Sequence, residues 1–141
     1  MQLTKHWAAQ LDDYAIDLAW NPTGTQLAAA SSAGPVSLFI ATDGKKLHEL
    51  PGHPAGTNCL AWAPSSGPQL ILATGGQDGS VKFWDALAGQ HTATANLGRE
   101  WVDHLVWVPS SNISHSPLVM GHSPPLLLAA VREMARVIAL T

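Results

Sequence analysis

The sequence predicts an all-β protein, built from about three repeats of a small four-stranded antiparallel sheet. The motif Leu-x-Trp-x-Pro, in which x is any residue, recurs at Leu18–Pro22, Leu60–Pro64 and Leu105–Pro109. The 12 glycines and 10 prolines are typical of short strands joined by tight turns. Residues 80–84 alternate in character, as a half-buried strand does. A chain of 141 residues has the size of about one domain, so we expect residues 1–141 to form one unit.

Each repeat is expected to contain its strands in the same order. The first strand ends at Trp-x-Pro, because proline has no N–H group to donate. In the middle repeat, residues 70–85 contain two further strands, joined by the hairpin signal Asp78-Gly79. Residues 126–141 align with this segment without a gap, which favours two strands there. The same residues are also good helix formers, so a helix over residues 126–140 is the alternative.

The spacing of the repeats points to a known architecture. The repeated tryptophans lie 42 and 45 positions apart, which fits the period of about 40–45 residues of a propeller blade. The middle repeat begins with Gly-His at 52–53 and ends with Trp-Asp at 84–85. In these features the chain resembles the WD-repeat β-propeller family. The resemblance implies a buried, hydrogen-bonded structural tetrad within this blade, formed by His53, Asp78, Thr74 and Trp84.

The outer repeats depart from this tetrad. At the corresponding positions the first repeat has Leu11, Ala33, Ala29 and Phe39, and the last repeat has Gly98, Met134, Ala130 and Leu140. Replacing a whole polar network by apolar groups can be nearly neutral for stability. We therefore expect these repeats to form blades without the hydrogen-bonded chain.

The resemblance also implies an incomplete ring. The blades are expected at about residues 14–50, 56–97 and 101–141, with a strand at 2–9 completing the last blade and a long loop at 110–125. Closed propellers have about four to eight blades, so three would leave sheet edges exposed. Three alternatives follow: a fragment of a longer propeller, two copies that close a six-bladed ring, or completion by another protein.

Composition excludes several functional classes. A net charge of −3, with 7 Lys and Arg against 10 Asp and Glu, argues against a nucleic-acid binder. No apolar run approaches the roughly 18 residues of a membrane span. The N-terminal segment has no signal-peptide pattern, and the one cysteine, Cys59, cannot form an internal disulfide. We expect an intracellular, cytoplasmic chain that binds neither nucleic acid nor membrane.

No catalytic residue, metal site or cofactor is expected. His53, Asp78 and Thr74 are assigned to the structural tetrad rather than to nucleophilic catalysis, because no nucleophile elbow is present. The Gly-rich residues 75–80 lack the Gly-Lys-Ser/Thr ending of a phosphate loop and fit a hairpin turn. The candidate metal ligands do not have a zinc spacing. They are Cys59, His104, His115 and His122.

The resemblance suggests that the chain binds other proteins. Loops that lead into the first strand of each blade lie at one rim, where partners of this family commonly bind. The candidate rim residues are Asp12, Asp13, Tyr14, Arg99 and Trp101. Aromatic residues and Arg are enriched in interfaces, although Trp101 could instead pack at a blade junction. We therefore expect a non-catalytic scaffold subunit of a larger complex. A fragment without independent function and a propeller enzyme with a rim active site are the alternatives.

Overall fold

The computed structural model describes residues 1–64, 68–108, 126–131 and 136–140. Within these ranges every element of regular secondary structure is a β-strand, as the sequence predicts. The first sheet consists of β1 (Ala15–Trp20), β2 (Gln26–Ser31), β3 (Val36–Ile40) and β4 (Lys46–Leu50). The second consists of β5 (Thr57–Trp62), β6 (Ile71–Gly76), β7 (Ser80–Asp85) and β8 (Gln90–Asn96). The third consists of β9 (Val102–Val108), β10 (Leu126–Val131) and β11 (Arg136–Leu140).

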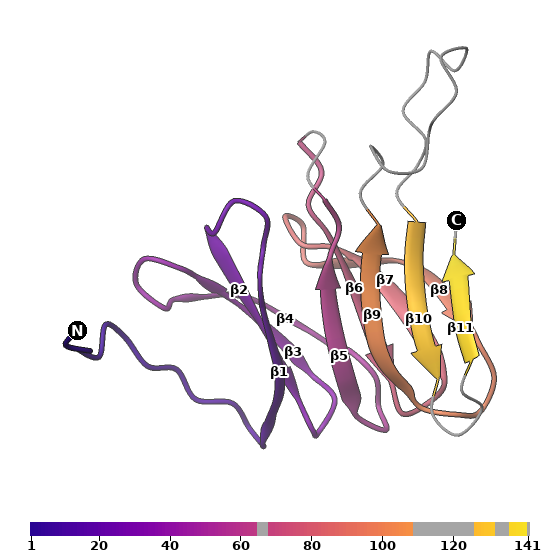
Figure 1. Ribbon diagram of the computed structural model, residues 1–141. Helices are drawn as coiled ribbons and strands as arrows, with labels where there is room; N and C mark the ends of the chain where they lie inside the picture. Colours follow the sequence, from indigo (N-terminus) through magenta and orange to yellow (C-terminus); the bar gives the residue numbers. More distant parts are fainter. Residues whose placement is uncertain (65–67, 109–125, 132–135, 141) are drawn as a thin grey trace, which may run out of the picture.

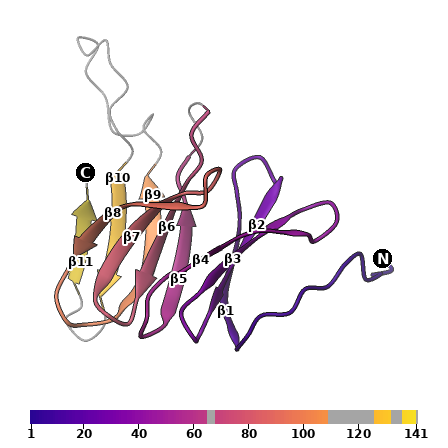
Figure 2. The ribbon, with the colours of Figure 1, turned by 180° about the vertical axis from the view of Figure 1, so that it is seen from behind.

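The sheets stand side by side in chain order, as blades of an incomplete propeller (Figures 1 and 2). The first strands of the sheets, β1, β5 and β9, are neighbours in this row. Neighbouring strands within each sheet are antiparallel. The first and third sheets therefore each have a neighbouring sheet on one face only, whereas the second has one on both faces.

The repeated tryptophans have the same register in all three sheets. Trp20 pairs with Leu27, and Leu27 pairs with Phe39. The corresponding rows are Trp62–Leu72–Trp84 in the second sheet and Trp107–Leu127–Leu140 in the third. The prediction of two strands in residues 126–140 is confirmed, and the helical alternative is wrong. Pairing with β9 decides between them, because helix propensity is a weak signal that tertiary contacts override.

Apolar residues fill the two spaces between the sheets. Between the first and second sheets lie Leu38, Leu50, Leu72 and Trp84, all at most 2% exposed. The space between the second and third sheets contains a second cluster, formed by Cys59, Ala73, Val81, Val102, Leu105, Leu127 and Ala129. Burial of this apolar surface is the main favourable contribution to folding.

Tryptophans also join neighbouring sheets by hydrogen bonds. The indole Nε1 of Trp62 donates to the carbonyl of Ala19 on β1, at 2.9 Å. In the same way, Trp107 on β9 donates to the carbonyl of Ala61 on β5, at 3.0 Å. Each acceptor is the residue directly before the repeated tryptophan of the preceding sheet. The two junctions between neighbouring sheets therefore contain the same tryptophan-to-carbonyl hydrogen bond.

The N-terminal segment differs from the expectation. The structure has no strand over residues 2–9, and the segment lies beside the first sheet, at the opposite end of the row from β11 (Figure 1). There the Trp7 ring packs against Phe39 at 6.2 Å, and its Nε1 donates to the Ala41 carbonyl at 2.8 Å. Because the three sheets form an open row, β11 is out of reach of this segment. The expected loop at 110–125 lies outside the described residues, as does Met134.

Candidate functional site

The structure brings His53, Asp78, Thr74 and Trp84 together in one chain of hydrogen bonds. The Nδ1 of His53 lies 3.0 and 3.1 Å from the carboxylate oxygens of Asp78. Its Nε2 lies 2.8 Å from the Thr74 hydroxyl, which accepts a hydrogen bond from the Trp84 indole at 2.9 Å. A carboxylate only accepts, which assigns the imidazole proton to Nδ1. The Thr74 hydroxyl then donates to Nε2.

Two strands, the turn between them and a loop position these side chains. Thr74 lies on β6 and Trp84 on β7, while Asp78 occupies the tight turn between these strands. Gly79 makes this turn possible with a φ of 78°, a conformation that favours glycine. His53 arrives from the segment after β4 and packs over Gly76, where an added Cβ would lie 2.2 Å from its Nδ1. The second sheet can therefore hold the imidazole only with glycine at position 76.

Sequence reasoning missed two members of this network. The Ser80 hydroxyl and backbone N–H donate to Asp78 Oδ1 at 2.8 and 3.0 Å, an arrangement that the Asp-Gly-Ser sequence allows. Thr57 accepts from the backbone N–H of His53 at 3.2 Å and donates to the Gly34 carbonyl of the first sheet. The network thereby links the interior of the second sheet to the first sheet.

Burial and charge act in opposite directions on the two titratable groups. The His53 side chain is fully buried, and burial lowers its pKa below the usual 6.5, although Asp78 opposes this shift. The nearby Lys82 adds to the lowering. The Asp78 side chain is 31% exposed, so the network ends at the surface rather than in the core. Burial raises the pKa of Asp78, but the hydrogen bonds from Ser80 and the nearby His53 outweigh it, and the pKa is lowered.

These shifts predict that acid destabilises the fold. A histidine whose pKa is lowered on folding contributes fully above its unfolded pKa of 6.5, and this contribution falls as the pH drops below 6.5. One proton can change the free energy of unfolding by at most about 1.4 kcal/mol per pH unit. We therefore expect His53 to account for a loss of less than about 2 kcal/mol between pH 6.5 and 5. Urea denaturation at several pH values measures it.

The control for this prediction is the exposed His104. His104→Gln should keep the loss between pH 6.5 and 5, because the imidazole of His104 is not buried. His53→Gln should abolish it. The Asp78 carboxylate adds a second loss near and below pH 4, since its lowered pKa stabilises the fold only while it is ionised. Stability that stays constant or rises on acidification to pH 5 would contradict the assigned protonation state.

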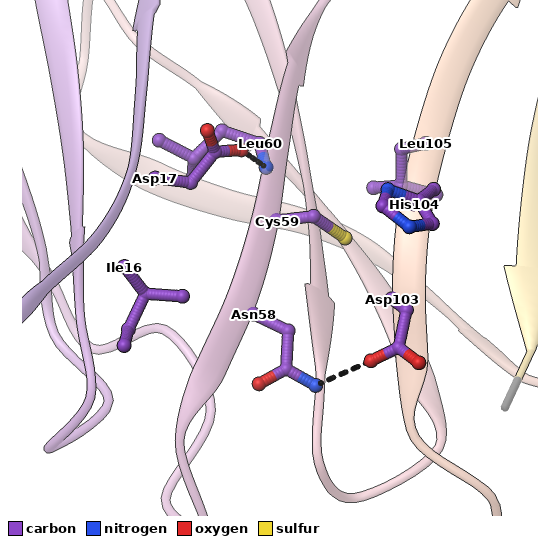
Figure 3. Close-up of a pocket in the computed structure, with 8 residues that line it drawn as sticks. All are labelled: Ile16, Asp17, Asn58, Cys59, Leu60, Asp103, His104 and Leu105. Atoms are coloured by element: carbon purple, nitrogen blue, oxygen red, sulfur yellow. Dashed lines mark hydrogen bonds between the residues drawn. The ribbon is translucent and has the colours of Figure 1, made fainter.

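A pocket of about 210 Å³ opens where the first strands of the three sheets meet (Figure 3). Its residues come from β1, β5 and β9; they are Ile16, Asp17, Asn58, Cys59, Leu60, Asp103, His104 and Leu105. Asp17 accepts hydrogen bonds from the backbone N–H groups of Leu18 and Leu60, both at 2.9 Å. Asn58 donates toward Asp103 at 3.5 Å. These polar groups hold neighbouring strands together.

The Cys59 thiol in this pocket is not reactive at neutral pH. Burial raises the pKa of the Cys59 thiol to about 12, so the thiol is protonated at neutral pH and is a poor nucleophile. Among the described residues, no group of three or more His, Cys, Asp or Glu side chains could hold a metal ion. Within the same part of the chain, no helix is long and apolar enough to cross a membrane. His115 and His122 lie outside the described residues.

The predicted rim residues lie in two loops at the same edge of the sheets. Asp12, Asp13 and Tyr14 precede β1, and Arg99 and Trp101 precede β9; both loops are at the lower edge in Figure 1. Tyr14 is 79% exposed, and Arg99 is exposed, whereas Trp101 is half-buried. Because the second sheet stands between the loops, the five residues form two separate groups on one rim.

Sequence reasoning also missed an apolar surface on the first sheet. We call it the open face: the side turned away from the second sheet, with Leu18, Trp20, Leu27, Ala29 and Phe39. Leu18 and Trp20 are 59% and 54% exposed, whereas Leu60 and Trp62, at the same positions of the second sheet, are 6% and 9% exposed. Leu18 and Trp20 have the same place in the repeat as Leu60 and Trp62, so the sequence contains no signal for their exposure.

Comparison with known proteins gives the same architecture. The family model "WD domain, G-beta repeat" matches residues 44–85. "Protein transport protein sec13" of Emericella nidulans is 32% identical over 112 residues, covering 66% of this chain and 36% of that protein. "WD repeat-containing protein 1" of Xenopus tropicalis is 33% identical over 87 residues, covering 60% of this chain and 14% of that protein. The chain thus spans little more than a third of the sec13 relative's length.

Solved structures have the same fold. A chain in the "Crystal Structure of Mitotic Checkpoint Complex" superposes with a TM-score of 0.69 at 25% identity, covering 89% of this chain and 35% of that chain. The computationally designed Ika4 protein superposes with a TM-score of 0.65 at 19% identity, covering 87% of this chain and 62% of that chain. In both comparisons the likeness extends over most of this chain, the outer sheets included.

Proposed function

Because the chain has the repeat and the blade architecture of the WD-repeat β-propeller family, we propose that it is a non-catalytic scaffold subunit of a protein complex. The observation that carries the proposal is the open face, where Leu18 and Trp20 are more than half exposed. Contiguous exposed apolar surface is typical of protein interaction sites. The sheets would serve as a rigid support for this face and for the rim loops.

The chemistry of the described residues also supports a binding role. The imidazole of His53 is occupied by Asp78 and Thr74 and has no exposed surface. The Cys59 thiol is protonated, and the Asp17 carboxylate is held by two backbone N–H groups. A catalytic nucleophile or base needs access to a substrate, which the buried His53 imidazole does not have, and the protonated Cys59 thiol is a poor nucleophile. The relatives are named for protein transport and for a checkpoint complex, which fits a role in an assembly.

The cysteine supports an intracellular location for this scaffold. Cys59 is free and 5% exposed, and its thiol contacts the backbone of Val102 at 3.5 Å. Structural disulfides are common in secreted domains, whereas cytoplasmic proteins keep their thiols reduced. We therefore place the chain in the cytoplasm, with other proteins as its partners and without a bound cofactor.

The rim loops are proposed as a second contact for these partners, beside the open face. Tyr14→Ala combined with Arg99→Ala removes two exposed side chains from the two loops, so folding should be unaffected. In affinity capture with quantitative mass spectrometry, this double variant should lose at least about 80% of the proteins that the wild-type chain retains. The reason is that aromatic and Arg side chains supply much of the binding energy of interfaces.

The matched control is Leu87→Ala, which removes a side chain that is 57% exposed on the turn after β7. This variant should retain the same proteins as the wild type. If the double variant retains them as well, the rim is not the contact. If the wild-type chain retains no protein above background, the scaffold function itself is wrong.

A further inference from the structure

The pocket where β1, β5 and β9 meet is built from one repeated irregularity of these strands. Each strand contains a β-bulge four residues before its repeated tryptophan, where one residue is left out of the pairing with the next strand. The bulged residues are Ile16, Asn58 and Asp103, and all three line the pocket (Figure 3). Bulges re-aim side chains and are frequent next to active sites. The pocket is therefore a product of the repeat itself.

The permanent charges of this pocket are negative. Among the described residues that line it, Asp17 and Asp103 have carboxylates, and none is Lys or Arg. Burial raises the pKa of the Cys59 thiol, and the nearby charges of Asp17 and Asp103 raise it further. Both carboxylates, which lie on different strands, thus act on the same buried wall. A ligand with a positive charge is therefore favoured over a neutral or a negative one.

The Asp17 carboxylate is able to accept further hydrogen bonds. Its oxygens accept from the backbone N–H groups of Leu18 and Leu60, both at 2.9 Å. A carboxylate has about four acceptor sites, so these two bonds leave about half of them for a ligand. The same bonds fix the orientation of the carboxylate, so little conformational entropy is lost when a ligand binds. Asp17 is half-buried, where an ion pair is screened less than at an exposed site.

The rest of the lining is mainly apolar. Leu60 and Leu105 are 6% and 8% exposed, and Ile16 is 48% exposed. Arg and Lys side chains pack their methylene stems on such surfaces and keep the charged end among polar groups. The guanidinium of Arg has five N–H donors in a planar fork that matches a carboxylate, whereas the ammonium of Lys is a strongly hydrated point charge. A volume of about 210 Å³ is below the roughly 300–1,000 Å³ typical of pockets for larger ligands, so it suits one side chain.

We propose that this pocket binds an arginine side chain of a partner protein. The guanidinium donates to the Asp17 carboxylate, and the methylene stem packs against Leu60 and Leu105. Asp103 supplies a second negative charge from β9. This inference deepens the proposed scaffold function and rests on it, because it names the chemistry by which a partner is held.

An NMR titration of the isotope-labelled full chain with the capped peptide Ala-Ala-Arg-Ala-Ala tests the proposal. The peptide should shift the amide signals of Leu18 and Leu60, which donate to Asp17, with a dissociation constant on the order of 1 mM. A peptide with citrulline in place of arginine keeps the shape without the charge, and should bind at least about tenfold more weakly. The lysine peptide should bind about fivefold more weakly than the arginine peptide.

Two variants of the pocket and one matched control locate the site. Asp17→Asn removes the charge but keeps an oxygen that accepts from the backbone, and should weaken binding about tenfold. Ile16→Lys places a cation beside Asp17 at a position that is 48% exposed, so the chain should fold and lose measurable binding. The control is Asp85→Asn, because Asp85 also accepts from two backbone N–H groups, those of Leu87 and Ala88, but lies outside the pocket. It should bind the arginine peptide as the wild type does.

Three outcomes would overturn the proposal. They are the absence of saturable shifts at Leu18 and Leu60, equal binding of the citrulline or the lysine peptide, and undiminished binding by the folded Ile16→Lys chain. Dispersion of the amide signals shows whether each variant is folded. Because the titration contains no other protein, its failure leaves the scaffold function to the capture experiment, and the two failures can be told apart.

Discussion

Trp84→Ala is expected to lower the free energy of unfolding by about 3–5 kcal/mol, because truncation of a buried aromatic residue leaves a large cavity. The Trp84 side chain is 2% exposed and lies in the core between the first and second sheets. Its removal also leaves the Thr74 hydroxyl without the donor that fixes it. A domain of this size is stable by about 5–15 kcal/mol, so the loss is a large part of the total.

Urea denaturation followed by circular dichroism measures the effect of Trp84→Ala at a fixed chain concentration, since association would shift the apparent stability. The control is Leu87→Ala, which removes an exposed side chain and should change stability by less than about 0.5 kcal/mol. A loss below about 1 kcal/mol for Trp84→Ala would mean that this side chain is not a central part of the core.

Thr74→Val should cost about 2–4 kcal/mol, although valine has nearly the same shape as threonine. The variant removes only the hydroxyl, which joins the Trp84 indole to the His53 imidazole at 2.9 and 2.8 Å. Thr74 and His53 are both fully buried, so water cannot replace the lost partner. A buried polar group left without a partner costs about 1–3 kcal/mol, and two such groups would be left here.

The control for Thr74→Val is Thr94→Val on β8, an exposed position where the hydroxyl contacts His91. It should change stability by less than about 0.5 kcal/mol in the same urea titration. Thr74→Ser keeps the hydroxyl and should retain more stability than the valine variant. If Thr74→Val is as stable as the wild type, the hydroxyl does not link the two rings.

The repeated tryptophans explain why so much of the fold could be predicted from the sequence. Trp20, Trp62 and Trp107 recur at one register, and the strands that contain them are the first strand of each sheet. For residues 126–141, the alignment with residues 70–85 predicts the observed strands, whereas the helix propensity of the same residues predicts a helix that does not form. In both cases the information lies in repetition, which a single segment does not contain.

Contacts between sheets were beyond the reach of sequence reasoning. The strand expected at residues 2–9 requires a closed ring, which the three sheets do not form. Instead, the Trp7 ring packs against Phe39 and its indole N–H donates to the Ala41 carbonyl of the first sheet. The family resemblance implies a buried Asp78, but its side chain is 31% exposed. Burial depends on what lies over the turn, and the local sequence does not specify this.

The exposure of the candidate interaction surfaces also depends on contacts between sheets, which the local sequence does not specify. The rim residues were chosen by their place before the first strands, and the structure puts them in two exposed loops at one edge. Nothing in the sequence predicts the open face, because Leu18 and Trp20 have the sequence pattern of core residues. Their exposure follows from their place on a face of the first sheet that no other sheet of the described residues covers.

Amide hydrogen exchange on the full chain, at a concentration where it is monomeric, tests the central claim most directly. The claim is that the second sheet is the stable centre of a row of blades whose end faces are left for partners. The account predicts the strongest protection in β6 and β7, which are paired on both sides and covered on both faces, and weak protection in residues 2–9. Equal protection in all three sheets, or stronger protection in β1 than in β6, would contradict it.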